Sequence, residues 1–373
     1  MHQRFNIPTD IIFGNGTLAD FQLPAGDLLF VSSASLDEAT FNSIENLFSH
    51  HDDDSITRII KPSGEPSSED IDEVFAGLPK FDSVFSVGGG STLDFAKSLA
   101  LLGGSGGRIA DYEFGDRIVS RVKPLYLVPT TCGTGSEVTP FAVINNSNTG
   151  RKFTLYHPDL RAAQAVIDPS LLVGLPDHII LPTALDAFSH CLEALLTRGN
   201  TQLIWPIAIH GLQIAWRQLK PESRARGGLD YFQELALLSL FGGIAIAHSR
   251  TGLIHTLSVA FAQYTKTPHG LLNSLLLPFA IRHNLEGYDG LLCRVVESTS
   301  GELLKDDHEA YEVLVSWLQD IVGDDLRLPL SCMAEHKEAL ISRISQDKGL
   351  PAICHGDVSE AGLGRLLEEI YRA

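Results

Sequence analysis

The segment that decides the fold reads SVFSVGGGSTLDFAK and spans residues 83–97. Its first five residues, Ser83 to Val87, form an apolar run of strand type, three glycines follow, and the pattern from Thr92 onward is helical. A strand that passes through a glycine-rich turn into a helix brings backbone N–H groups and a helix N-terminus close to an anion, which is how a pyrophosphate is usually held. The segment therefore predicts that a dinucleotide phosphate binds at this turn.

The glycine spacing alone leaves a second interpretation open. It matches neither G-x-G-x-x-G nor G-x-x-x-x-G-K-[ST], so a tight turn whose glycines serve only helix–sheet packing is the alternative. A second polar turn, PTTCGTGSE over residues 129–137, follows another apolar run and presents hydroxyls and glycines of the kind that contact phosphate and ribose. Ser136 is followed by Glu137 and Val138 where a hydrolase elbow needs a glycine, so this turn indicates binding and not nucleophilic catalysis.

The pattern of apolar runs changes near residues 175–182. Before this point, short runs of strand type alternate with helical patterns, which indicates an α/β domain with a largely parallel, dinucleotide-binding sheet. After it, long stretches rich in Leu, Ala, Glu and Ile predict helices. We therefore expect an α/β domain over residues 1–178 and an all-helical domain over residues 179–373. The expected strands are 27–32, 83–87, 125–129 and 165–167, and the expected helices include 183–196, 203–219 and 231–247.

The composition excludes several classes of partner. The chain has 373 residues, of which 44% are hydrophobic, and a formal net charge of −18. Binding to nucleic acid or to an anionic membrane needs clustered Lys and Arg, which this chain lacks.

Its five cysteines include no C-x-x-C pair, so neither a disulfide framework nor a thiolate zinc site is indicated. The N-terminus has no apolar signal region, and the most apolar stretch, 235–247, is shorter than the roughly 18 residues of a membrane span. We expect a cytoplasmic protein.

Four polar side chains lie in the apolar helical half. Asp186 and His190 are four residues apart in a helical stretch, so their side chains project from the same face of the helix, one turn apart. That geometry suits a shared divalent cation. Such a pair is also a common helix-stabilising contact. His255 and His269 lie in strongly apolar surroundings, where an unpartnered imidazole is costly to bury. Together they predict an Asp/His₃ site for Fe²⁺ or Zn²⁺, since imidazole and carboxylate donors without sulfur suit both ions.

These motifs resemble those of the iron-containing (group III) alcohol dehydrogenase family over nearly the whole chain. They are IFG from Ile12, GGGSTLDFAKSLA from Gly88, PTTCGTGSEVTPFAVI from Pro129, IDP from Ile167, ALDAFSHCLEAL from Ala184, GLIHTL from Gly252 and PHGLLNSLLLP from Pro268. The resemblance implies the fold shared with dehydroquinate synthase, NADH or NADPH as hydride carrier, and metal ligation by Asp186, His190, His255 and His269. It implies cofactor contacts at Gly88, Gly89, Gly90, Ser91, Asp94, Thr130, Thr131, Thr134, Ser136 and Lys152.

Three positions depart from the family pattern. Ser33 stands where many members have an Asp that binds the adenosine ribose, and loss of that charge removes repulsion against a 2′-phosphate, so NADPH is expected to be accepted as well as or instead of NADH. Val259 replaces a second histidine four residues after His255, so a proton relay there is absent. Arg250 and the threonine that follows it resemble the basic-Thr pattern of family members that reduce phosphonoacetaldehyde. Arg250 is therefore a candidate for binding an anionic group of the substrate. The alternative is an arginine whose side chain extends into solvent.

The resemblance implies hydride transfer between nicotinamide and an alcohol or aldehyde with a metal as Lewis acid, which needs no protein nucleophile. His157 and His248 are candidate proton carriers, although an ordinary structural role is the commoner one. A rival within the superfamily is a zinc-dependent glycerol dehydrogenase or a dehydroquinate synthase-like cyclase, which typically lacks a ligand at the position of His190. A rival from another class is a nucleotide-binding protein without catalysis. A homodimer or higher homo-oligomer is the expected assembly.

Overall fold

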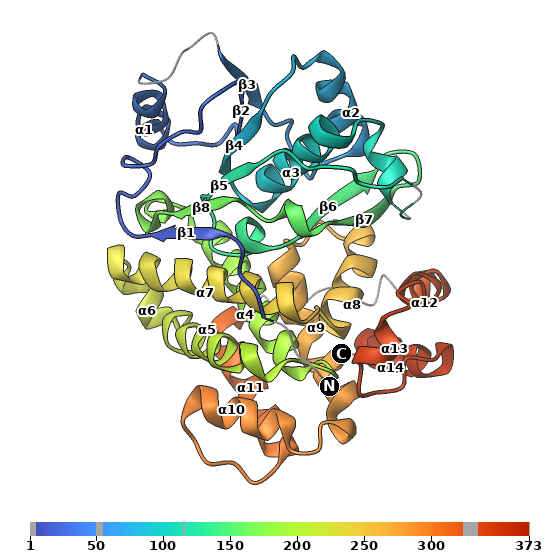
Figure 1. The fold of residues 1–373 in the computed structure, drawn as a ribbon. Helices are drawn as coiled ribbons and strands as arrows, with labels where there is room; N and C mark the ends of the chain where they lie inside the picture. Colours follow the sequence, from blue (N-terminus) through green and yellow to red (C-terminus); the bar gives the residue numbers. More distant parts are fainter. Residues whose placement is uncertain (1–4, 50–54, 114, 116, 324–334, 373) are drawn as a thin grey trace. The chain divides into compact units, whose positions relative to one another are not determined.

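The computed structural model describes residues 5–49, 55–113, 115, 117–323 and 335–372. The chain forms two compact units, one over Asn6–Leu175 and one that begins at Pro176 and also includes Phe5. Every strand lies in the first unit, and among the described residues beyond Ile167 there is no strand. The predicted fold class, a parallel α/β part followed by a helical part, is confirmed (Figure 1).

A six-stranded parallel sheet forms the centre of the first unit, and its carboxyl ends lie along one edge because all paired strands run in the same direction. The strand order is β1-β8-β5-β4-β2-β3. A separate antiparallel pair, β6 and β7, follows β5 in the chain. The bounds are β1 (Asp10–Phe13), β2 (Leu28–Ser32), β3 (Ile56–Ile60), β4 (Ser83–Gly88), β5 (Leu125–Pro129), β6 (Phe141–Asn146), β7 (Arg151–Tyr156) and β8 (Gln164–Ile167). The four predicted strands are confirmed as β2, β4, β5 and β8.

The two faces of this sheet carry separate apolar clusters, because side chains alternate along each strand. On β2, Leu29 and Val31 belong to the cluster that contains residues of α2 (Ser68–Gly77) and α3 (Gly90–Ser105). Leu28 and Phe30 belong to the cluster that contains residues of α1 (Glu38–Phe48) and Leu18. Burial on both faces explains why the central strands are continuous apolar runs in the sequence.

The second unit is a set of packed helices. Its central helix, α4, begins at Asp177, six residues earlier than the predicted start at 183, and includes Pro182 in its first two turns. The helices are α4 (Asp177–Leu196), α5 (Trp205–Gln218), α6 (Pro221–Arg226), α7 (Leu229–His248), α8 (Leu253–Phe261), α9 (His269–Asn284), α10 (Leu291–Ser300), α11 (Asp307–Val322), α12 (Lys337–Ile344), α13 (Leu350–Ile353) and α14 (Glu360–Arg372).

Helices α4 and α7 are each 20 residues long and apolar enough to cross a membrane by length and composition. The apolar stretch 235–247 covers only part of α7, so the helix is longer than this stretch indicates. However, 83% and 67% of their most apolar windows are buried inside the protein, as in the core helices of a packed unit. Four cysteines, Cys132, Cys191, Cys293 and Cys354, form no disulfide bond, and Cys332 lies outside the described residues.

Asp168 ties the N-terminal turn to the end of β8. Its Oδ1 accepts hydrogen bonds from the backbone N–H groups of Gly16 and Ser170, each at 3.0 Å, and its Oδ2 accepts one from Leu18 at 3.1 Å. The residue is 3% exposed. Because Leu18 is part of an apolar cluster on the sheet, this one carboxylate fixes the segment that covers that face.

We predict that Asp168→Ala lowers the free energy of unfolding by about 2–4 kcal/mol, because three backbone N–H groups lose a charged acceptor and one of them, that of Leu18, is buried. Urea unfolding followed by circular dichroism measures the change. Asp159→Ala, at an exposed position, is the matched control. Equal unfolding midpoints for the two variants would show that Asp168 does not anchor this segment.

Candidate metal centre and cofactor turns

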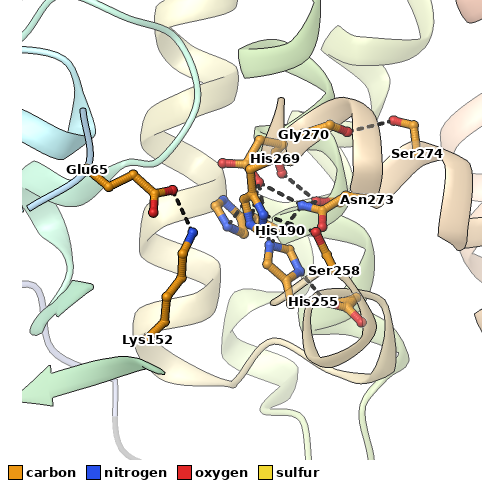
Figure 2. Close-up of polar contacts among 12 residues, drawn as sticks. Glu65, Lys152, His190, His255, Ser258, His269, Gly270, Asn273 and Ser274 are labelled. Atoms are coloured by element: carbon orange, nitrogen blue, oxygen red, sulfur yellow. Dashed lines mark hydrogen bonds and ion pairs between the residues drawn. The ribbon is translucent and has the colours of Figure 1, made fainter. Parts of the chain in front are cut away.

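Three imidazoles converge on one carboxylate oxygen in the helical unit, as Figure 2 shows for the histidine side chains. The Nε2 atoms of His190, His255 and His269 lie 3.7, 3.5 and 3.7 Å from Oδ1 of Asp186. One ligand atom each of Asp186, His255 and His269 lies within 4.8 Å of the others. The three distances that meet at Asp186 Oδ1, 3.5–3.7 Å, match edges of a tetrahedron whose centre is about 2.2 Å from each corner, close to the bond length from zinc to nitrogen or oxygen, although the mutually close group of three does not include His190. The donor set therefore fits a divalent metal ion.

Three helices supply this donor set. Asp186 and His190 are one turn apart on α4, His255 is the third residue of α8, and His269 is the first residue of α9. Gly270 allows α9 to begin directly against α4, because a Cβ there would overlap the carbonyl oxygen of Pro182 and come within 2.9 Å of the Asp186 Cβ. The predicted set of four is thus brought together by a close helix approach.

A second layer of polar side chains holds the histidines in place. Glu193 accepts a hydrogen bond from His255 Nδ1 at 2.6 Å and another from the backbone N–H of Ile254 at 2.7 Å. Ser258 Oγ lies 3.0 Å from His269 Nδ1 and shares a hydrogen bond with it. With Nδ1 engaged in this way, Nε2 of both rings is directed toward Asp186. Such partners fix the orientation and the tautomer of a metal-binding imidazole.

Asn273 lies at the centre of the same group and is fully buried. Its Nδ2 is 2.9 Å from Asp186 Oδ1, to which it donates, and 3.2 Å from His255 Nε2. Its Oδ1 and the Nδ1 of His190 are buried without a hydrogen-bond partner among the described residues. Buried polar atoms without a hydrogen-bond partner are unusual except at sites that bind a ligand or an ion.

The charges of the cluster are balanced internally. Burial raises the pKa of the Asp186 carboxyl, but the attraction of His190, the hydrogen bond from His255 and the attraction of His269 outweigh this and hold the pKa well below its usual range. Burial lowers the pKa of His190 to about 4. Burial also disfavours the charged form of His255, but hydrogen bonds to Asp186 and Glu193 raise its pKa to about 9. Asp186 is therefore anionic and His190 neutral near pH 7, the forms in which these groups bind metals, whereas His255 is protonated in the metal-free protein and releases that proton when a metal binds at its Nε2.

Glu193, Ser258 and Asn273 were missed in the sequence, although a signal was present. Each stands three or four residues from a predicted ligand on the same helix: Glu193 after His190, Ser258 after His255 and Asn273 after His269. That spacing places each of them on the same face as the ligand. A polar stripe along an otherwise apolar helix was the pattern that could have identified them.

The predicted cofactor residues of the α/β unit follow neighbouring strands of the sheet. Ser33 follows β2, the turn Gly88–Ser91 follows β4, and the turn Thr130–Ser136 follows β5. Since β2, β4 and β5 are adjacent and parallel, all three segments lie at the same carboxyl edge, where α/β sheets usually bind ligands. The Oγ of Ser33 lies 2.7 Å from that of Ser35, and no carboxylate stands at this position.

The two polar turns pack directly against each other. A Cβ at Gly90 would lie 2.5 Å from atoms of Thr134, and one at Gly89 would lie 3.2 Å from Thr131. The backbone N–H of Thr130 also donates to the carbonyl of Gly88 at 3.0 Å. The glycines therefore do serve packing, but the packing is between the two turns that were predicted to bind one cofactor.

Asp94 and Lys97 lie one turn apart on α3, and both bind the end of the second turn and the segment that follows it. Asp94 accepts from Ser136 Oγ at 2.7 Å and from the backbone N–H of Val143 at 2.9 Å. Both carboxylate oxygens of Asp94 are thus used inside the protein. Lys97, which was not singled out in the sequence, is fully buried, and burial lowers its pKa to about 8 although Asp94 and Glu137 partly offset this.

Other predicted site residues have partners of their own. Ser91 Oγ donates to the carbonyl of Gly64 at 3.0 Å. Lys152, on β7, donates to Glu65 Oε1 at 2.6 Å, as Figure 2 shows. Arg250 has a half-exposed side chain, and one of its guanidinium nitrogens lies 3.6 Å from Asp347 Oδ1.

The two candidate proton carriers make structural contacts. His157 Nδ1 accepts from the backbone N–H of Asp159 at 3.2 Å, and His248 Nδ1 lies 2.8 Å from the carbonyl of Ile244 while its ring packs on Phe5. Val259 lies on α8, one turn beyond His255.

Two family models match this chain. Residues 8–169 match the model described as iron-containing alcohol dehydrogenase, and residues 180–350 match the C-terminal model of the Fe-containing alcohol dehydrogenase family. The NAD-dependent methanol dehydrogenase of Bacillus methanolicus is 30% identical over 292 residues, which are 75% of this chain and 76% of that protein.

Solved structures share the fold over the full length. An iron-containing alcohol dehydrogenase from Thermotoga maritima has a TM-score of 0.87 and 24% identity, with 100% of each chain covered. A sulfoacetaldehyde reductase from Bifidobacterium kashiwanohense, solved with NAD⁺, has a TM-score of 0.86 and 21% identity and covers 100% of this chain and 99% of its own. The fold class expected from the sequence is confirmed.

Glu137 gives a prediction for stability against pH. It is 1% exposed, its Oε2 has no hydrogen-bond partner among the described residues, and burial raises its pKa from 4.5 to about 7. Because the folded-state pKa is raised, the stability that the protonated side chain contributes is complete below pH 4.5 and is lost as the pH rises through about 7. Glu137→Gln should therefore gain stability relative to wild type between these values, by up to about 3 kcal/mol.

Urea unfolding of both proteins at several pH values from 4.5 to 8 measures this difference. Contributions from groups that do not interact with Glu137 cancel, because the two proteins differ at one position. A difference that does not change with pH would contradict the buried, protonatable state of Glu137.

Proposed function

The chain belongs to the iron-containing alcohol dehydrogenase family, and from this premise we propose that it transfers a hydride between NADH or NADPH and a small alcohol or aldehyde, with its metal held by Asp186, His190, His255 and His269. The observation that supports this most is the convergence of three Nε2 atoms on Asp186 Oδ1 at 3.5–3.7 Å. A nucleotide-binding protein without catalysis would have no need of a buried cluster of this composition. The ligand at His190 favours the iron-type branch over the glycerol dehydrogenase and cyclase branches.

When bound, the metal supplies Lewis-acid polarisation of an alcohol or carbonyl oxygen, and the nicotinamide supplies the hydride chemistry. The residues of the chain orient these groups. Glu193 and Ser258 hold the rings of His255 and His269, and Asn273 holds the carboxylate of Asp186. The side chain of His269 is 38% exposed whereas those of the other three ligands are nearly buried, so the cluster is open to a substrate at His269.

The cofactor is proposed to bind at the carboxyl edge of the sheet. The N-terminus of α3 offers backbone N–H groups to the pyrophosphate at Gly88–Ser91, and Thr130–Ser136 contacts the nicotinamide ribose. Residues 1–178 then form the dinucleotide-binding domain and residues 179–373 the metal-binding domain. The absence of a carboxylate at Ser33 supports acceptance of NADPH as well as NADH.

Three further assignments belong to this proposal. The metal is Fe²⁺ or Zn²⁺, since the N₃O donor set suits both. The charge and composition support a cytoplasmic enzyme that works on small molecules. Membership of this family supports a homodimer or a higher homo-oligomer.

We predict that removal of the metal by a chelator abolishes NADH-dependent aldehyde reduction and that Fe²⁺ or Zn²⁺ restores it. Asp186→Asn should lose most of the metal affinity because a charged ligand is removed. Glu193→Gln should weaken metal binding by about 10–100-fold, because it removes the charged acceptor that orients His255. Metal content, metal titration and NADH oxidation at 340 nm measure these effects.

His157→Ala, which changes a histidine outside the cluster, is the control and should keep wild-type metal affinity. If Asp186→Asn binds metal as tightly as wild type while folded, the assigned ligand set is wrong. If the metal-loaded wild type oxidises no NADH or NADPH with any aldehyde, the proposed activity is wrong.

We also propose that Arg250 selects anionic aldehydes such as phosphonoacetaldehyde. The side chain is 54% exposed and its pairing with Asp347 is 3.6 Å long, so little free energy is needed to release it. Arg250→Ala should lower kcat/KM for phosphonoacetaldehyde by about 10–100-fold relative to an uncharged aldehyde of similar size, because a charge-assisted hydrogen bond is lost. Arg226→Ala, on α6, is the control. An unchanged ratio of the two kcat/KM values would contradict the role of Arg250.

A further inference from the structure

Lys97 is a charged side chain that no solvent reaches. It lies on α3, it is 0% exposed, and it stands two turns after the glycine turn. Its Nζ donates to the carbonyl oxygens of Ser136, Thr139 and Phe141 at 2.5, 3.0 and 2.7 Å, and Oγ1 of Thr139 lies 3.2 Å away. An ammonium group has three protons, and here three carbonyls receive them. Lys97 is therefore committed to the protein and is not a contact for the cofactor phosphates.

The carbonyls that Lys97 binds belong to the segment directly after the hydroxyl-bearing turn. Ser136 is the last residue of that turn, and Thr139 and Phe141 lead into β6. Asp94, one turn before Lys97 on the same helix, binds the Ser136 hydroxyl and the backbone of Val143. One face of α3 thus binds both ends of the segment 136–143.

The charge of Lys97 is balanced inside the unit. Asp94 and Glu137 both stabilise its ammonium form, while Glu137 is itself buried. A neutral side chain at this position would leave three buried carbonyl groups without their donor. The position therefore requires a donor that reaches three carbonyls at once, which lysine supplies.

We infer that Lys97 is a positioning residue for the cofactor: it holds Thr130–Ser136 against the Gly88–Ser91 turn, so that both turns can contact one dinucleotide. The contacts of Gly90 with Thr134 and of Gly89 with Thr131 show how close the two turns are. The inference rests on the proposed function for the place where the dinucleotide binds, and it adds a residue that makes no contact with the cofactor.

The test compares two ligands of the metal-loaded protein, NADH and ADP. ADP lacks the nicotinamide half, so it needs the Gly88–Ser91 turn but not Thr130–Ser136. For Lys97→Met we expect the Kd of NADH to rise about tenfold or more and the Kd of ADP to change by less than about twofold. NADH fluorescence and calorimetry with ADP measure these constants without turnover. Ser98→Ala is the matched control, because Ser98 is buried on the same helix and its hydroxyl donates to the carbonyl of Asp94 within α3.

Lys97→Arg is the second variant, in case Lys97→Met does not fold. It keeps the charge, but a planar guanidinium cannot donate to three carbonyls in the geometry of an ammonium, so NADH binding should weaken more than ADP binding here too. Equal weakening of NADH and ADP would overturn the inference, because it would show general damage to α3. Unchanged binding of both ligands by a folded variant would overturn it as well. If wild type binds neither NADH nor NADPH, the proposed function fails instead.

Discussion

The helical unit depends on the burial of one charged oxygen, Oδ1 of Asp186. A carboxylate that is 5% exposed is costly unless charges or donors compensate it. Its compensation comes from His190 on its own helix, from His255 on α8, and from His269 and Asn273 on α9. Three helices are thereby tied to a single atom. The same group of donors, with Nε2 atoms directed inward, is a ligand set for a divalent cation, so the interaction that orders the unit is also the one that gives it chemistry.

The α/β unit contains the opposite case, a buried cation. Lys97 is compensated by backbone carbonyls and by Asp94 and Glu137, and the result is that two turns from different strands become one surface. In both units a glycine in the first turn of a helix permits the close approach: Gly90 at the start of α3 and Gly270 at the start of α9. In this enzyme the buried charges and the small residues beside them determine where the functional groups lie.

The sequence was sufficient for the fold class, because strand runs and helix periodicity are local signals. Histidines in apolar surroundings are a local signal as well, and they singled out side chains that the fold brings together around Asp186. The sequence was insufficient where a property arises from tertiary packing. Lys97 follows a helical pattern in which a lysine usually faces solvent, and only the packing of residues 136–143 over α3 buries it. Arg250 pairs with Asp347, which is distant in sequence, so no local pattern revealed that contact. Strand β3 was missed because it lies at the edge of the sheet and is partly exposed, which interrupts the apolar run.

Three imidazoles and one carboxylate are proposed to hold the metal. X-ray absorption spectroscopy of the protein loaded with iron or zinc tests this ligand set most directly. The expected first shell contains nitrogen and oxygen alone at about 2.0–2.2 Å, with the multiple scattering of three imidazole rings. A sulfur scatterer at about 2.3 Å, or imidazole scattering from fewer than two rings, would contradict it.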